Sequence, residues 1–288
     1  MKGRILLLVF FGCLVVWGYA PLERGNVPKV WDFRAVDTNE VYLPLTNYGI
    51  IGHDVDNGTA GAYWPSGYPN ETYIFGSGFW VGAIRMRYDD SLSEWVPDTN
   101  IARGYLTGSG ESEFIPGLNP EDADSPDVKL YFSTDPDWTM GEVVSDLETY
   151  CWYSETVDSL QFSDMALGVL VEQWTYCWTS PWYNQDVIYF RWRVINVGDS
   201  TLYDVYLGYC ADWDIGDEAV NPNDIPWYDF DRGLVYQYQL DAEDGWEHFP
   251  GYIGYMVLRG PVAGDTVLRY RPDSTFDTIY PGEYIPMT

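Results

Sequence analysis

The sequence VIYFRWRVINVG, residues 187–198, carries the clearest strand pattern in the chain. Its apolar residues Ile188, Phe190, Trp192 and Val194 alternate with Tyr189, Arg191 and Arg193. A period of two places the two sets on opposite faces of a β-strand. The turn sequence NVGDS follows, and then a second alternating stretch, TLYDVYLGYCADWD at 201–214. The short gap between the stretches predicts an antiparallel hairpin.

Similar patterns recur along the chain. They predict strands at 73–89, 165–178, 233–241, 252–260 and 265–273. Segments rich in Gly, Pro, Asn and Asp, such as 117–127 and 221–233, predict the intervening loops. No window of a dozen residues shows a convincing apolar stripe at helical spacing together with capping residues. We therefore expect an all-β protein, a large antiparallel β-sandwich with long acidic and aromatic loops, forming one domain over residues 21–288.

The amino-terminal residues 1–20 have the features of a secretory signal peptide. Lys2 and Arg4 precede an apolar run from Ile5 to Trp17, and the segment ends on the small residues Gly18 and Ala20 around Tyr19. The run is too short to cross a bilayer as a helix. Gly12-Cys13 offers lipid attachment as an alternative, which the preceding Phe residues fit poorly. We expect a secreted protein, extracellular or on the cell surface, without a transmembrane segment.

The chain is strongly acidic, with a net charge of −29. Loss of Lys2 and Arg4 with the leader leaves 13 bases against 44 acids, a net charge of −31. Such a field repels nucleic acid and attracts cations, so we expect no nucleic-acid partner. The 14 Trp, 25 Tyr and 12 Phe supply enough apolar surface for a packed core, which argues against disorder.

Four acids follow the second alternating stretch within seven residues: Asp212, Asp214, Asp217 and Glu218. Close carboxylates repel one another unless a cation or protons intervene. Gly216 allows a sharp turn between them, and hard cations such as Ca²⁺ bind six to eight oxygen atoms. The pattern is not an EF-hand, because the twelfth position would be Asn223. The sequence predicts a calcium-binding loop here.

A second acidic loop contains Asp54, Asp56 and Gly58 in HDVDNGT. We predict Asp54 and Asp56 as further metal ligands. The alternative, for both loops, is that Asp and Gly form solvated turns in an acidic protein.

Enzymatic motifs are scarce in the sequence. His53 and His248 are the only histidines, and no G-x-S-x-G or H-E-x-x-H motif occurs. Glycoside hydrolysis needs only two carboxylates, and Glu172, on an apolar and aromatic strand, is the best candidate acid. An ion-paired or edge-strand glutamate is the alternative, and we predict no catalytic residue.

Aromatic residues in the expected loops suggest a binding role. Trp and Tyr rings stack on sugars, and the candidates are Trp178, Trp182, Trp227 and Tyr228. Core packing is the other use of aromatic residues in large sandwiches. Glycans or other cell-surface components are therefore possible partners.

Three cysteines remain after the leader: Cys151, Cys177 and Cys210. An exported protein can form one disulfide among them, and the similar settings YCWY and YCWT favour Cys151 with Cys177. Buried free thiols are the alternative.

Three stretches resemble a known group of proteins: LPLTNYGIIGHDVDNG (43–58), YIFGSGFWVGAI (73–84) and FRWRVINVGDSTLYDVYLGYCADWDIGD (190–217). They resemble the amino-terminal region of large secreted or cell-surface proteins of Bacteroidetes-like and candidate-phylum bacteria, which often end in a type IX secretion sorting domain. Nothing resembling a sorting domain follows here, so the resemblance implies a piece of a longer protein.

These observations together favour an exported, non-enzymatic structural or adhesive β-sandwich module with a cation-stabilised loop. A carbohydrate-binding module or glycoside hydrolase-type domain is the alternative.

Overall fold

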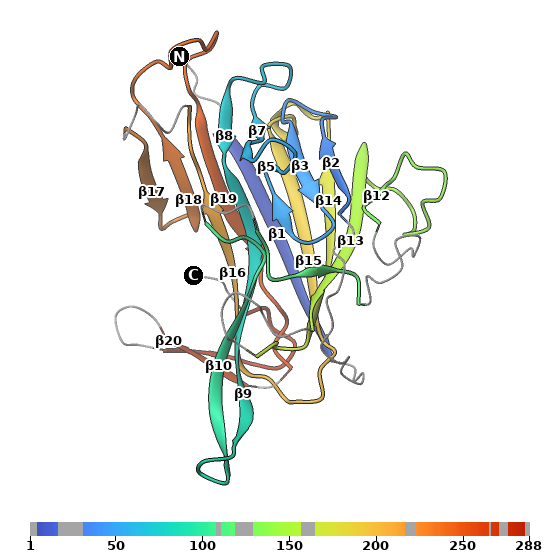
Figure 1. The fold of residues 1–288 in the computed structure, drawn as a ribbon. Coiled ribbons are helices and arrows are strands. Elements are labelled where there is room, and N and C mark those ends of the chain that lie inside the picture. The colour runs from blue at the N-terminus through green and yellow to red at the C-terminus, as the bar shows by residue number, and fades with distance from the viewer. Residues whose placement is uncertain are drawn as a thin grey trace.

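The computed structural model describes residues 5–16, 31–107, 111–118, 129–156, 165–216, 223–264, 266–270 and 276–285. Two large β-sheets face each other and share one core (Figure 1). The described residues contain no α-helix, only a 3-10 turn at Trp182–Asn184. The predicted all-β sandwich is confirmed.

The larger sheet has nine strands. Along one path their order is β11 (Ile115–Pro116), β13 (Leu147–Glu155), β14 (Val169–Cys177), β15 (Val187–Asn196), β1 (Ile5–Val16), β19 (Tyr252–Arg259), β18 (Leu234–Tyr238) and β17 (Ile225–Asp229). β12 (Tyr131–Phe132) also pairs with β13. β1 lies outside the predicted domain of residues 21–288 and runs parallel to both of its neighbours, whereas the described strand pairs within that domain are antiparallel, as predicted.

The smaller sheet has six strands. Their order is β10 (Glu94–Arg103), β9 (Gly76–Asp89), β4 (Ile50–Ile51), β3 (Leu43–Thr46) and β2 (Phe33–Val36), with β16 (Tyr203–Asp212) also paired to β9. Two-stranded units join β5 (His53–Asp54) to β6 (Thr59–Ala60), β7 (Ala62–Tyr63) to β8 (Thr72–Ile74), and β20 (Val267–Tyr270) to β21 (Phe276–Ile279). The long β9–β10 hairpin extends past the sandwich at the bottom of Figure 1.

The core lies between the sheets and is rich in aromatic rings. As the alternation in 187–198 predicts, Ile188, Phe190, Trp192 and Val194 are buried. Trp192 stacks on Phe79 of the opposite sheet, with ring centroids 4.7 Å apart. Burying large apolar rings from both faces is the main force that holds the two sheets together.

The predicted hairpin of β15 and β16 is wrong, because the two strands lie in different sheets. The backbone N–H groups of Val197 and Gly198 donate to the carbonyl of Gly168, which ties the connection to the segment before β14. The chain then crosses the core, and Trp192 faces Tyr209 with centroids 5.9 Å apart. The alternating pattern identifies which face of a strand is buried. It does not identify the sheet to which the strand belongs, because strands of both sheets bury one face in the shared core.

The cysteine pairing predicted from the sequence is also wrong. Cys151, Cys177 and Cys210 are free thiols in the described chain, and the first two are buried. Cys151 lies opposite Gln173 in the β13–β14 ladder, four positions along β14 from Cys177, too far for a disulfide. Burial raises the pKa of the Cys177 thiol to about 12 and also raises that of Cys151. Burial therefore disfavours the thiolate form of both residues.

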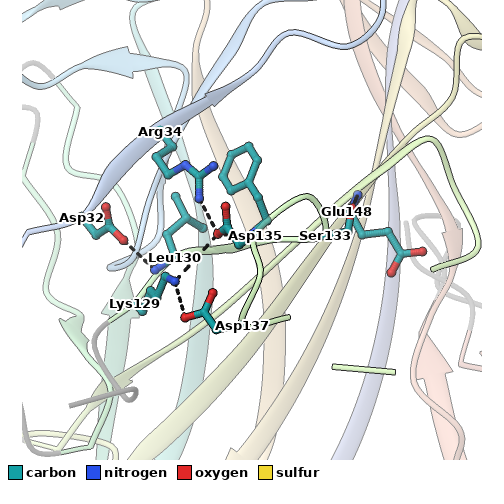
Figure 2. Close-up of polar contacts among 9 residues, drawn as sticks. Asp32, Arg34, Lys129, Leu130, Ser133, Asp135, Asp137 and Glu148 are labelled. Atoms are coloured by element: carbon teal, nitrogen blue, oxygen red, sulfur yellow. Dashed lines mark hydrogen bonds and ion pairs between the residues drawn. The ribbon is translucent and has the colours of Figure 1, made fainter. Parts of the chain in front are cut away.

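A polar cluster joins β2, in the smaller sheet, to the segment before β13 (Figure 2). The Asp135 carboxylate accepts a hydrogen bond from Arg34 at 2.6 Å and lies 3.9 Å from the Lys129 ammonium. Lys129 also pairs with Asp137 at 2.5 Å. The Arg34 guanidinium lies over the Phe132 ring, 3.7 Å from its centroid. This cluster fixes β2 against residues 129–137.

Candidate cation-binding loop

The acidic loop begins where β16 ends. Asp212 belongs to the sheet: it lies opposite Gly76 in the β16–β9 ladder, and its carboxylate accepts a hydrogen bond from the Tyr105 hydroxyl at 3.1 Å. Asp214 starts the loop proper, and its N–H donates to the carbonyl of Tyr73. Asp212 is therefore already used by the ladder, whereas Asp214 lies at the entrance of the loop.

Asp224 closes the other end of the loop. Its Oδ2 accepts hydrogen bonds from the Ile215 N–H at 3.0 Å and from the Gln237 side-chain amide at 2.7 Å. The same amide donates to the carbonyl of Trp213 at 2.8 Å. One carboxylate thus holds the two loop ends and β18 together.

Glu243 approaches the loop from a different part of the chain. A Cβ atom placed on Gly216, which has φ +92°, would lie 2.4 Å from the Glu243 carboxyl carbon. Only glycine leaves room for that carboxylate. Glu243 Oε1 accepts a hydrogen bond from the Gln239 amide at 2.8 Å. Gln239 and Glu243 are 2% and 8% exposed, so the carboxylate is held in a nearly dry position.

We call Asn223, Asp224, Gln239 and Glu243 the acceptor cluster. Among the residues that the structure describes, three of its buried oxygen atoms, Asn223 Oδ1, Asp224 Oδ1 and Gln239 Oε1, have no hydrogen-bond donor. The indole N–H of Trp213 also has no acceptor in this part of the chain. Buried acceptors without donors are rare in native proteins and usually indicate a bound water or ion.

Electrostatics at the cluster point the same way. Burial raises the pKa of Asp224 from its ordinary value, and the charge of Glu243 raises it further, against the hydrogen bonds from Ile215 and Gln237. Among the described residues, Asp224 forms no salt bridge with a basic side chain. A buried carboxylate in this position is stabilised by a proton or by a cation.

The described residues do not by themselves complete a metal site. No group of three or more His, Cys, Asp and Glu side chains is placed to hold a metal ion in the described ranges. The acceptor cluster instead combines two carboxylates with two side-chain amides. Asp217 and Glu218, both predicted as ligands, lie outside the described residues, in the segment that joins Gly216 to Asn223.

The second acidic loop is used differently. Asp54 Oδ1 accepts hydrogen bonds from the N–H groups of Asp56 and Asn57, and Oδ2 accepts one from the Asn57 side chain at 2.7 Å. These are the bonds of a self-contained turn. Asp56 is exposed. The hydrogen bonds are those of the solvated turn that the sequence left as the alternative.

The histidines and Glu172 have structural partners. His53 is buried, with Nδ1 2.8 Å from the carbonyl oxygen of Phe75. The His248 ring lies 3.0 Å from the buried carboxylate of Glu71. Glu172 pairs with Arg193, its cross-strand neighbour, at 3.0 Å, and accepts a hydrogen bond from Tyr150. For Glu172 the ion-paired alternative is confirmed.

The four aromatic candidates do not converge on one groove. Trp182 is 75% exposed on the 3-10 turn, and Trp178 is half-buried, edge-on to Tyr189. Trp227, which is 60% exposed, and Tyr228 lie on β17 and not in a loop, contrary to prediction. Four strands separate β14 from β17 in the sheet. The two pairs of rings therefore belong to distant parts of the same sheet.

Comparisons with known proteins add no relative. No family model, no curated protein and no solved structure matches this chain. The resemblance to type IX secretion proteins therefore stays a prediction. In the part of the chain that the structure describes, no helix is long and apolar enough to cross a membrane.

Proposed function

We propose that the chain is an exported, non-enzymatic β-sandwich module of an extracellular or cell-surface protein, and that Ca²⁺ stabilises its acidic loop. The observation that carries the proposal is the acceptor cluster, where buried oxygen atoms lack donors. Carbonyl and carboxylate oxygens are the ligands that Ca²⁺ prefers.

The ligand set differs from the one that the acidic run alone suggests. Asp224 and Glu243 provide carboxylates, and Asn223 and Gln239 provide amide oxygens. Asp217 and Glu218 lie outside the described residues, and the proposal is that they and Asp214 complete the six to eight oxygens of a calcium site. Asp212 lies at the end of the β16–β9 ladder and its Oδ2 accepts a hydrogen bond from Tyr105, so its role as a ligand stays a prediction.

A structural or adhesive role fits the rest of the molecule better than catalysis. Both histidines and Glu172 are held by structural contacts. The carbohydrate alternative has the exposed rings of Trp182 and Trp227 in its favour, but they lie on separate elements. The calcium site is therefore the part of the proposal to test first.

The test compares thermal unfolding in excess EDTA and in millimolar Ca²⁺ for the wild type, Asp224→Asn and Asp56→Asn. Saturating Ca²⁺ at 100 times Kd stabilises the folded state by about 2.7 kcal/mol, roughly 5 °C in Tm for a chain of this size. Asp224→Asn keeps the shape and an acceptor oxygen but removes the charge, so we expect it to lose this increment.

Asp56→Asn is the matched control, since it removes one exposed acidic charge from the other loop. We expect it to keep the full calcium increment. Wild-type protein that melts at the same temperature with and without Ca²⁺ would refute the calcium site and leave the loop as a solvated turn.

A further inference from the structure

Strand β1 creates a conflict between the sequence and the fold. It covers residues 5–16, which the sequence predicts to be removed with the signal peptide. In the structure it is an internal strand: Leu7 to Val16 lie in parallel register with Val187 to Asn196 of β15, and Ile5 to Phe11 with Tyr252 to Arg259 of β19. Removal of the leader therefore takes one strand out of the middle of the nine-stranded sheet.

One wall of the resulting gap, β15, is held in place without β1. All nine residues of β14 pair with β15 on its other edge. Trp192 stacks on Phe79 of the opposite sheet, and its indole N–H donates to Gln173 at 2.8 Å. These contacts do not involve residues 5–16.

The other wall, β19, is also anchored independently. It pairs with β18 on its far edge, and Tyr255 packs against Tyr209 and Trp213, with ring centroids 5.4 Å apart in each case. Just before the strand, the Gly251 N–H donates to the Tyr73 hydroxyl at 2.9 Å. Glu71, 2% exposed, accepts the N–H groups of Glu247 and His248. Contacts with the opposite face thus anchor β19 without residues 5–16.

Two neighbours of one missing strand are about 10 Å apart, twice the usual strand spacing. Each wall would present a row of unpaired N–H and C=O groups, and the core residues of β15 would lie open beside them. An extended polypeptide added between the walls satisfies both rows, as in β-strand addition. A gap with two rigid walls is therefore a preformed acceptor for one strand.

We propose that the leader-free protein accepts, between β15 and β19, a strand from a second polypeptide that runs parallel to both walls. The inference rests on the exported state of the proposed function. The register with β15 requires about ten extended residues, and the segment whose backbone pairs there has the apolar sequence ILLLVFFGCLVV. Residues 21–288 contain no other uninterrupted apolar run of this length, and the net charge of −31 favours a donor flanked by Lys or Arg.

The experiment uses the full chain expressed in an export-competent host and purified from the exported fraction. Intact mass locates its amino terminus. The probe is a peptide of residues 5–16 with Cys13→Ser and two lysines at each end, and the control is the same peptide with Val9→Pro. Val9 lies in register with both walls, opposite Tyr189 and Met256, so proline there disrupts the ladder.

We expect the exported chain to lack residues 1–20 and to exchange backbone amides of 187–196 and 252–259 rapidly. The first peptide should slow this exchange about tenfold or more and raise Tm, whereas the proline peptide should do neither. If the leader-free chain does not fold alone, refolding with each peptide gives the same comparison, and only the first should restore folded protein.

Three results would overturn the inference: both segments protected without peptide, equal effects of the two peptides, or no effect of either. In all three cases the calcium response can still be measured on the same preparation, so the proposed function is tested independently of this inference. Retention of residues 1–20 would make β1 a permanent strand and would overturn both the inference and the removal of the leader.

Discussion

At the scale of single residues, Asp135 shows how a surface-facing cluster contributes to stability. Burial raises the pKa of its carboxyl, but the hydrogen bonds from Arg34 and the Phe132 N–H, with the charges of Arg34 and Lys129, outweigh burial and bring the pKa below its ordinary value. A lowered pKa means that folding favours the ionised form. The stabilisation is therefore present above the ordinary carboxyl pKa of about 3.9 and is lost as pH falls through the lower folded value.

We predict that Asp135→Asn destabilises the protein at pH 7 by about 1 kcal/mol, because it removes the charge-assisted hydrogen bond to Arg34. The difference from the wild type should vanish at a pH below the folded pKa of Asp135. Urea unfolding of both proteins over a series of pH values measures this. Asp137→Asn removes a more exposed partner of Lys129 and should change stability little; similar losses in the two variants would contradict the assignment.

Glu172 illustrates what the sequence shows about a single residue. An acid on a strand of apolar and aromatic residues indicates a special environment, and both catalysis and ion pairing satisfy that pattern. The deciding fact is the cross-strand register, which places Arg193 opposite Glu172. Register depends on tertiary packing and cannot be obtained from one strand's composition.

At the scale of elements, the connection between β15 and β16 depends on two glycines. A Cβ atom on Gly168, which has φ +74°, would lie 2.8 Å from the Cα of Gly198. The carbonyl of Gly168 also accepts the two hydrogen bonds that hold the connection. The close approach lets the chain leave one sheet and enter the other.

Gly168→Ala should therefore destabilise the fold by roughly 2–3 kcal/mol, from positive-φ strain together with the backbone contact. Gly141→Ala is the control, since φ is +111° but no atom lies within 4 Å of the added Cβ. Chemical denaturation of both variants separates the two effects. Equal losses would mean that strain alone matters and that the approach to Gly198 carries no cost.

Long strands with clear alternation could be predicted from the sequence, whereas short or polar strands could not. The stretches at 73–89, 165–178 and 187–198 contain β9, β14 and β15. The sequence does not predict β10, because Pro97 and Asp98 interrupt its alternating pattern. β10 is an edge strand that pairs only with β9, and an edge strand tolerates such residues. β17 lies within the predicted loop 221–233, since its Pro and Asp residues resemble turn chemistry.

The candidate site was only partly predictable for a similar reason. The acidic run correctly marked the end of β16 and the start of a loop. Asp224, Gln239 and Glu243 come from the start of β17 and the segment after β18, and only the fold brings them to Gly216. A single sequence carries no signal that these three residues lie close to Gly216, apart from the repeated acidic residues themselves.

At the scale of the whole molecule, acidity affects stability independently of any site. With 44 acids and 15 bases, like charges repel throughout the folded surface. Monovalent salt screens this repulsion over about 10 Å at 0.1 M. Any divalent cation also screens it, so a rise in Tm with Ca²⁺ alone does not distinguish a binding site from a diffuse ion atmosphere.

We predict that the two effects separate at high salt. NaCl should raise Tm of the wild type and Asp224→Asn by the same amount, because both carry almost the same net charge. At about 0.5 M NaCl, where screening acts within a few ångströms, millimolar Ca²⁺ should add a further increment to the wild type only. Differential scanning calorimetry over a grid of NaCl and Ca²⁺ concentrations measures both the screening effect and the calcium increment. An increment of equal size in both proteins would assign the calcium effect to the acidic surface as a whole, because a site that includes Asp224 cannot bind equally well without its charge.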